Sequence, residues 1–113
     1  MKLIIAVIQP ARLEEVKEEL YKQDVNLITV SEVMGHGRQK GATQIYRGSR
    51  EAGCLLKKIK IEIACNAEHA QPVIDALTQS ARSGEVGDGK IFVLDLHDAL
   101  RIRTGESGVQ AIA

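Results

Sequence analysis

The sequence predicts an α+β fold in which two β-α-β units share one sheet. Apolar runs typical of strands alternate with amphipathic segments of helical period, in the order β-α-β and again β-α-β. The two halves also resemble each other weakly, since LIIAVIQPARLEEVKEEL compares with IKIEIACNAEHAQPVIDAL. Two such units interleave into a ferredoxin-like sheet with both helices on one face. The length predicts a single domain over residues 1–113.

The first half supplies a strand, a helix and a second strand. Residues 2–8 form a continuous apolar run, which predicts a strand buried on both faces. Pro10 fits just ahead of a helix start, and the segment after it is amphipathic. The apolar positions of that helix are Leu13, Val16 and Leu20. Residues 25–33 are rich in β-branched side chains, which predicts the second strand.

The second half repeats this order. Residues 58–64 alternate cleanly, with isoleucines on one face and charged side chains on the other. Asn66 could cap the next helix, but Pro72 predicts that the regular helix begins only near that residue. The apolar stripe of the helix is Ala70, Val73, Ile74, Leu77 and Ala81. Residues 91–96 are expected to form the fourth strand.

One face of the predicted sheet remains uncovered by helices. It carries Lys58, Lys60 and Glu62 among apolar residues, and such a face must contact partner subunits or a ligand. This arrangement predicts an oligomer with sites between its chains.

Composition excludes several classes of protein. The formal net charge is +0, so no global basic field indicates a nucleic-acid partner. No apolar run approaches the roughly 18–20 residues that span a membrane, and the first residues read as a strand followed by acidic residues rather than as a signal peptide. Cys54 and Cys65 lack CxxC spacing and predict reduced thiols, so we expect a cytoplasmic protein.

A long glycine-bearing stretch separates the second and third strands. Residues 35–53, GHGRQKGATQIYRGSREAG, contain five glycines and one strongly apolar side chain, Ile45. Connections of this length are usually either functional or disordered.

Three glycine-bearing patches carry cationic side chains. Residues 84–90, GEVGDGK, match the first part of a phosphate loop, although Ile91 replaces the hydroxyl residue and the helix precedes the loop. The glycines allow N–H groups to converge on an anion, or they form a turn that closes the helix. Asp88 is either a general base or a residue that shapes this turn, and the turn is favoured.

The other two patches point in the same direction. Arg101 and Arg103 alternate, so both could project one way from an extended segment towards a polyphosphate, or form a solvated pair. The third patch is Gly35, Gly37, Arg38, Gln39 and Lys40. Together the patches predict one shared anionic ligand such as a nucleotide. The histidines lack metal-ligand spacing with the cysteines, and no nucleophile with its base is evident.

Five segments in order resemble the PII family of nitrogen-regulatory signal proteins: TVSEVMGHGRQKG, YRG, KIKIEIA, SARSGEVGDGKIFV and RIRTGE. The resemblance implies a homotrimer of ferredoxin-like subunits with ATP or ADP in the cleft between neighbours. It also identifies residues of about 36–56 as the T-loop, which contacts targets, and residues of about 97–113 as a C-terminal segment that contacts the nucleotide.

The resemblance assigns site residues by position. Those around the nucleotide are Thr29, Gly35, Gly37, Arg38, Glu62 and Ala64; those around its phosphates are Gly87, Asp88, Gly89 and Lys90; Arg101 and Arg103 reach in from the neighbouring subunit. The positions that accept 2-oxoglutarate with Mg²⁺ and ATP are Gln39, Lys40, Gly41, Lys58 and Gly87. Gln39 would complete the oxygen shell of the magnesium ion.

The T-loop both matches the family and departs from it. Tyr46, Arg47 and Gly48 match its tip and imply contact with a target such as a membrane transporter or a regulatory enzyme. Glu51 replaces the tyrosine that many bacterial members have uridylylated, whereas Ser49 and Tyr46 remain candidates for modification.

The leading interpretation is therefore a sensor of ATP, ADP and 2-oxoglutarate that controls nitrogen-metabolism targets and is not an enzyme. One alternative is a specialised paralogue that senses adenine nucleotides and another anion, such as bicarbonate, and regulates a transporter. A slow ATPase and a purely structural module are weaker alternatives.

Overall fold

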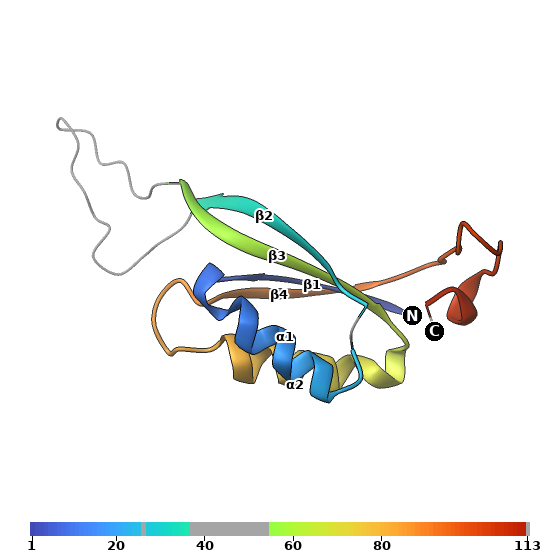
Figure 1. Cartoon of the computed structure of the whole chain (residues 1–113), viewed down its shortest axis with the longest axis horizontal. Coiled ribbons are helices and arrows are strands. Elements are labelled where there is room, and N and C mark those ends of the chain that lie inside the picture. The colour runs from blue at the N-terminus through green and yellow to red at the C-terminus, as the bar shows by residue number, and fades with distance from the viewer. Residues whose placement is uncertain (26, 37–54, 113) are drawn as a thin grey trace.

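The computed structural model describes residues 1–25, 27–36 and 55–112. These residues form a four-stranded antiparallel sheet in the order β2-β3-β1-β4, with two helices on one face (Figure 1). The elements are β1 Lys2–Ile8, α1 Leu13–Lys22, β2 Thr29–His36, β3 Leu55–Cys65, α2 Ala67–Ala81 and β4 Gly89–Asp95, with 3₁₀ turns at Pro10–Arg12 and Gly108–Ile112. The predicted ferredoxin-like α+β fold is confirmed.

β1 is buried on one face only, so the prediction of burial on both faces is wrong. Ile4, Ala6 and Ile8 are at most 2% exposed, whereas the residues between them are half-buried. Both helices lie on the same side of the sheet, and none of the described residues covers the opposite face (Figure 1). The apolar run over residues 2–8 is continuous because the side chains of β1 on the open face are also apolar.

The core lies between the helices and the covered face of the sheet. The predicted alternation in β3 is confirmed, because Ile59, Ile61 and Ile63 are buried and the intervening charged residues lie on the open face. α1 and α2 bury their apolar stripes against these isoleucines. The helical residues with the smallest exposure are Val16, Leu20, Val73 and Leu77. No helix in the described part of the chain is long and apolar enough to cross a membrane.

Three strands have boundaries that differ from the prediction. β2 begins at Thr29 rather than at residue 25, because the chain turns at Asp24, where φ is 59°. Val25 and Ile28 are apolar because they pack against the core from the connection. β3 begins at Leu55, earlier than predicted, and β4 spans 89–95 rather than 91–96.

The start of α2 also differs from the prediction. The helix begins at Ala67 and contains Pro72. Ala70 and Val73 are 8% and 1% exposed, so packing of this first part offsets the one hydrogen bond that a proline cannot donate. Asn66 occupies the cap position, but its side chain makes no capping hydrogen bond, and only its backbone carbonyl accepts from the N–H of His69, at 3.0 Å.

Candidate functional site

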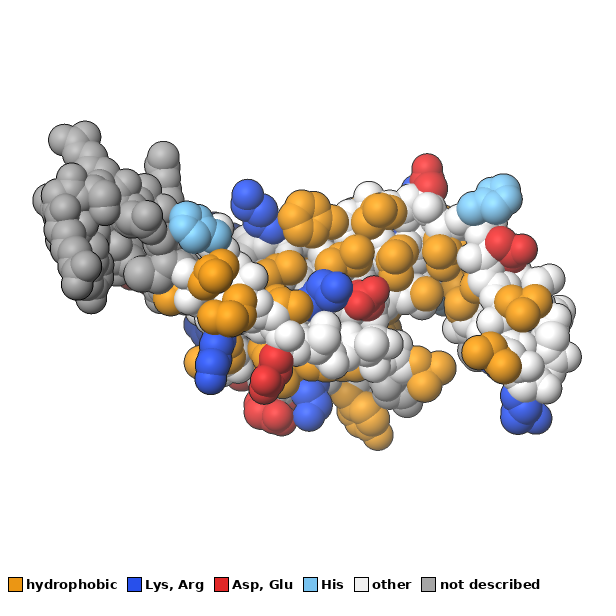
Figure 2. All heavy atoms as spheres, turned by 90° about the horizontal axis from the view of Figure 1, so that it is seen from above, with side chains coloured by type: hydrophobic (Ala, Val, Ile, Leu, Met, Phe, Trp, Pro, Cys, Tyr) orange, Lys and Arg blue, Asp and Glu red, His pale blue; other side chains and the backbone are white. Residues whose placement is uncertain are grey.

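The strand register places several of the predicted ligand residues on the open face of the sheet. Thr29 in β2 is paired with Glu62 in β3, and Lys60 and Lys90 flank Val7 of β1. The face is mainly apolar, with few charged side chains near its middle (Figure 2). Its half-buried or exposed apolar residues are Leu3, Ile5, Val7, Phe92 and Leu94. Glu62 pairs with Lys60 at 3.6 Å.

The loop between α2 and β4 needs glycine at its end. Gly84, Gly87 and Gly89 have φ values of 88°, 100° and 109°, a range that L side chains rarely adopt. Gly89 also lies against the backbone of β1, where a Cβ atom would stand 1.8 Å from the carbonyl oxygen of Val7. The loop therefore reaches the open face of the sheet only because this position lacks a side chain.

Asp88 organises the same loop. Its carboxylate accepts hydrogen bonds from the backbone N–H groups of Ser83 and Gly84, both at 2.8 Å, and from the hydroxyl of Ser83. These bonds, that of the Ser83 hydroxyl first, hold the pKa of Asp88 below its usual value, and the positive charge of Arg12 adds to the effect. Asp88 therefore shapes the turn, as its position between Gly87 and Gly89 predicted.

The carbonyl of Gly87 is held from two sides. Nε2 of Gln9 donates to this oxygen at 2.7 Å, and Nζ of Lys58 donates to it at 3.1 Å. Lys58 comes from the middle of β3 and Gln9 follows β1, so the two contacts tie the loop to the end of the sheet.

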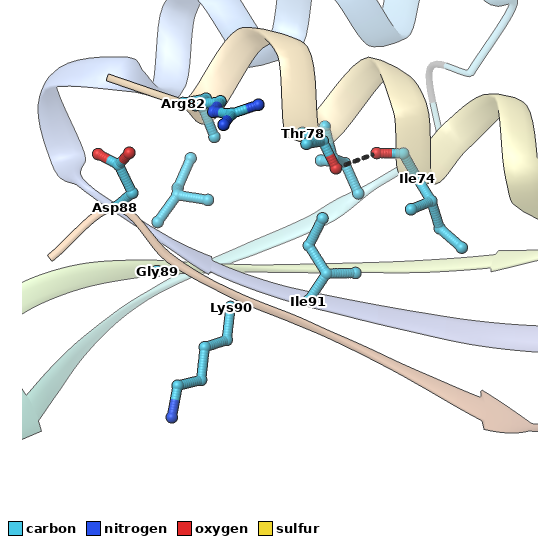
Figure 3. Close-up of a pocket in the computed structure, with 10 residues that line it drawn as sticks. Ile74, Thr78, Arg82, Asp88, Gly89, Lys90 and Ile91 are labelled. Atoms are coloured by element: carbon cyan, nitrogen blue, oxygen red, sulfur yellow. Dashed lines mark hydrogen bonds between the residues drawn. The ribbon is translucent and has the colours of Figure 1, made fainter. Parts of the chain in front are cut away.

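Lys58 and the glycine loop line an open cavity of about 670 Å³ on the open face. Of the predicted ligand residues it contains Gly35, Lys58, Gly87, Asp88, Gly89 and Lys90. The volume is in the range of small-molecule sites. Lys90 projects away from α2, whereas Ile91 points towards it (Figure 3). A separate hollow of about 350 Å³ lies on that helix side, where Ile74, Leu77 and Ile91 make its lining largely apolar.

Other predicted residues lie elsewhere. Ala64 lines a hollow of about 590 Å³ at the opposite end of β3, together with Leu27 and Asn66. Thr29 and Glu62 lie between the two regions, on the open face. The hollow near Ala64 also contacts α2 through His69 and Val73, and it shares no lining residue with the cavity near Gly87.

The expectation of an extended segment at Arg101 and Arg103 is wrong. The backbone turns there, and the N–H of Gly105 donates to the carbonyl of Arg101 at 2.8 Å. Glu106 closes the turn, because its carboxylate accepts from the guanidinium of Arg101 at 3.3 Å and from the hydroxyl of Thr104 at 2.8 Å. The alternation of Arg101 and Arg103 in the sequence does not predict this turn. The turn depends on Gly105, which has a φ of 74°.

The arginine turn lies at the far end of β4 from the cavity (Figure 1). β4 has seven residues, and a strand rises about 3.3 Å per residue, so about 20 Å separates its ends. One chain therefore does not bring Arg101 and Arg103 to its own Lys58 and Lys90.

Several predicted residues lie outside the described residues. They are the ligand positions Gly37, Arg38, Gln39, Lys40 and Gly41, the tip residues Tyr46, Arg47 and Gly48, and the modification candidate Ser49.

Sequence motifs did not identify Gln9 or Glu106. Gln9 stands beside Pro10 at the end of a strand, and only the strand register brings it to Gly87. Glu106 follows the RIRTG motif directly, and a carboxylate so close to two arginines was a usable signal for a closed turn.

Comparisons with known proteins match nearly the whole chain. A sequence profile of the family described as nitrogen regulatory protein P-II matches residues 1–106. The nitrogen regulatory protein P-II of Rhizobium etli is 47% identical over 112 residues, which cover 99% of this chain and 100% of that protein. The nitrogen regulatory protein GlnK1 of Methanosarcina mazei is 52% identical over 114 residues, which cover 99% and 97%. The nitrogen regulatory protein P-II 2 of Methanothermobacter thermautotrophicus is 47% identical, with the same coverage.

Proposed function

Because this chain belongs to the nitrogen regulatory protein P-II family, we propose that it senses ATP, ADP and 2-oxoglutarate and reports them to nitrogen-metabolism targets in the cytoplasm. The observation that carries the proposal is the cavity in which Lys58 of β3 meets the loop of Gly87 to Lys90. Two cations and a glycine loop beside a cavity suit a polyphosphate and a carboxylate.

The nucleotide would lie with its phosphates in the cavity between β3 and the glycine loop. Its phosphates would contact the loop at Gly87, Asp88, Gly89 and Lys90, where Asp88 already bonds Ser83 and Gly84 and so keeps the loop folded. Ala64 stands six residues from Lys58 in β3, about 20 Å at about 3.3 Å per residue, so Thr29, Glu62 and Ala64 would contact the nucleotide that the loop of the neighbouring chain holds. Gly35 borders the same cavity as the loop, which supports the placement of the phosphates.

The second ligand would be 2-oxoglutarate, bound next to the phosphates. The ammonium of Lys58 faces this cavity and would pair with a carboxylate of the ligand. The described residues contain no group of three His, Cys, Asp or Glu side chains that could hold a metal ion. Mg²⁺ would accordingly take its oxygen ligands from ATP, from 2-oxoglutarate and from Gln39, whose neighbours Lys40 and Gly41 complete the site.

We propose a homotrimer, because two features are incomplete in a single chain. The open face of the sheet leaves Phe92 and Leu94 49% and 44% exposed, and burying them would favour association. The turn that carries Arg101 and Arg103 is distant from the cavity of its own chain (Figure 1). Ile102 at its tip is 94% exposed, as expected for a residue that contacts a neighbouring subunit. The arginines would then serve the next chain's nucleotide.

The output would be the T-loop, with Tyr46, Arg47 and Gly48 at the point of contact with a transporter or a regulatory enzyme. A ligand that binds one conformation of this segment more tightly shifts the population towards it. Glu51 has no hydroxyl group, so uridylylation at this position is chemically excluded.

Calorimetric titration tests the proposal. ATP and ADP are titrated first, and 2-oxoglutarate is then titrated with Mg²⁺ into protein saturated with either nucleotide. We expect 2-oxoglutarate to bind only in the presence of ATP. Absence of binding with either nucleotide, while ATP itself binds, would contradict 2-oxoglutarate as the second ligand and make bicarbonate the next anion to test.

A further inference from the structure

The carbonyl oxygen of Gly87 accepts hydrogen bonds from two side chains of different charge. The neutral amide of Gln9 lies at 2.7 Å and the ammonium of Lys58 at 3.1 Å, and both contacts are partly buried. A carbonyl oxygen has two lone pairs, so it can accept both bonds at once. Only Lys58, of these two donors, carries a charge that an incoming carboxylate would seek.

From this geometry we infer that Gln9 is a positioning residue for the second-ligand site. It holds the peptide of Gly87 in place, and it thereby leaves the ammonium of Lys58 available for a carboxylate. The inference rests on the proposed function, because it takes 2-oxoglutarate as that carboxylate.

The exchange of partners by Lys58 depends on what remains bound to Gly87. A charged donor forms a stronger hydrogen bond with a carboxylate than with a neutral carbonyl, so a bound anion would draw Lys58 towards itself. Without Gln9, that movement would leave a partly buried carbonyl without either of its two side-chain donors, which is costly. With Gln9 in place the carbonyl keeps one donor throughout.

The rest of the loop is held by contacts that do not involve Gln9. Asp88 bonds the backbone of Ser83 and Gly84, and Gly89 lies against Val7. Removal of the Gln9 amide should therefore loosen the peptide of Gly87 without unfolding the loop. A Gln9 variant can accordingly be tested as a folded protein.

The main test is Gln9→Ala, with 2-oxoglutarate titrated into protein saturated with Mg²⁺ and ATP. We expect the affinity for 2-oxoglutarate to fall about fivefold to tenfold, as for a lost hydrogen-bond partner. The affinity for ATP alone should fall by a smaller factor, because Asp88 and Gly89 still hold the rest of the phosphate loop. The matched control is Gln71→Ala, which removes an exposed amide that donates to Asp75 at 2.9 Å in α2. The control should change neither affinity.

A second variant separates positioning from a general loss of structure. In Gln9→Glu the new carboxylate would pair with Lys58 and compete with the ligand from within the protein. We therefore expect weaker 2-oxoglutarate binding than in Gln9→Ala, with a smaller loss for ATP. If both variants weaken ATP and 2-oxoglutarate equally, Gln9 has only a structural role and the inference is wrong.

Amide hydrogen exchange of Asp88, whose N–H lies in the same peptide group as the Gly87 carbonyl, distinguishes failure of the inference from failure of the proposed function when it is measured without ligand. If the unmodified protein does not bind 2-oxoglutarate, the proposed ligand is wrong, and faster exchange at Asp88 in Gln9→Ala would still support the positioning role. Unchanged exchange would overturn that role. Unchanged 2-oxoglutarate affinity in Gln9→Ala, in a protein that binds the ligand, would also overturn it.

Discussion

Gly89 and Val7 approach so closely that a Cβ atom on Gly89 would lie 1.8 Å from the carbonyl oxygen of Val7. The backbone of Gly89 also has φ of 109°. We therefore expect Gly89→Ala to lower the free energy of unfolding by about 3 kcal/mol or more, since it combines overpacking with a strained backbone. Chemical denaturation at a fixed protein concentration measures this change.

Gly84→Ala provides the matched control. Gly84 also has a positive φ, of 88°, but nothing lies within 4 Å of a Cβ atom placed there. Only the strain of a positive φ remains in this variant, so we expect the free energy of unfolding to fall by about 1 kcal/mol. Equal losses in the two variants would show that the contact with Val7 is not the cause.

The loop should respond to acid through Asp88. Hydrogen bonds from Ser83 and Gly84 lower the pKa of this carboxyl group in the folded chain. The stabilising effect of the carboxylate is therefore present above the unfolded pKa of about 4 and is lost as pH falls through the lower, folded pKa. We expect the amide NMR shifts of Ser83 and Gly84 to change together over that acidic range.

Two variants identify the group that titrates. Asp88→Asn should abolish the acid transition at Ser83 and Gly84. The pKa of Asp95 is also lowered, by its hydrogen bond with Lys2, but this pair lies at the other end of β4. Asp95→Asn should therefore leave the acid transition at Ser83 and Gly84 unchanged. If that transition disappears in Asp95→Asn, its assignment to Asp88 is wrong.

Lys58 should matter more for 2-oxoglutarate than for ATP. Lys58→Ala removes a charged donor from the cavity, and a charged hydrogen bond contributes about 1.5–3 kcal/mol, so we expect at least about a tenfold loss of 2-oxoglutarate affinity by calorimetry. Lys57→Ala is the control, since Lys57 precedes it in β3 and projects from the other face. Equal losses in both variants would indicate an effect of overall charge.

The open face of the sheet should carry the subunit interface. Phe92→Glu would place a charge on that face, and we expect analytical ultracentrifugation to show a mass near the 12.3 kDa of one chain instead of three times that value. Tyr21→Glu is the control, because Tyr21 is 69% exposed at the end of α1 on the helix side. A trimer that persists in Phe92→Glu would contradict this interface.

Periodicity predicted most of the fold, because the covered face of the sheet and both helices have regular apolar spacing. The alternation around Ile61 identified β3, and the helical stripe ending at Ala81 identified α2. It failed where tertiary packing outweighs local preference. Val25 looks like a strand residue but packs from a connection, and Pro72 does not delay a helix whose first part is buried.

The site was predicted less completely than the fold. Glycine and lysine at residues 84–90 indicated either an anion loop or a turn that closes the helix, and the positive φ values of Gly84, Gly87 and Gly89 show a turn. The contact of Gln9 with Gly87 joins residues that are 78 positions apart, and only the pairing of β1 with β4 brings them together. The turn closed by Glu106 was not predicted, because two arginines separated by one residue point the same way only if the backbone is extended.

β4 fixes the distance between the glycine loop at its start and the arginine turn beyond its end. Its seven pairs with β1 fix its register, and a shift by one residue would turn every side chain to the opposite face. The separation between the glycine loop and the arginine turn can therefore change only by insertion or deletion, in steps of about 3.3 Å. Single-residue insertions in β4 should consequently be far less tolerated than insertions in the exposed segment after Asp95.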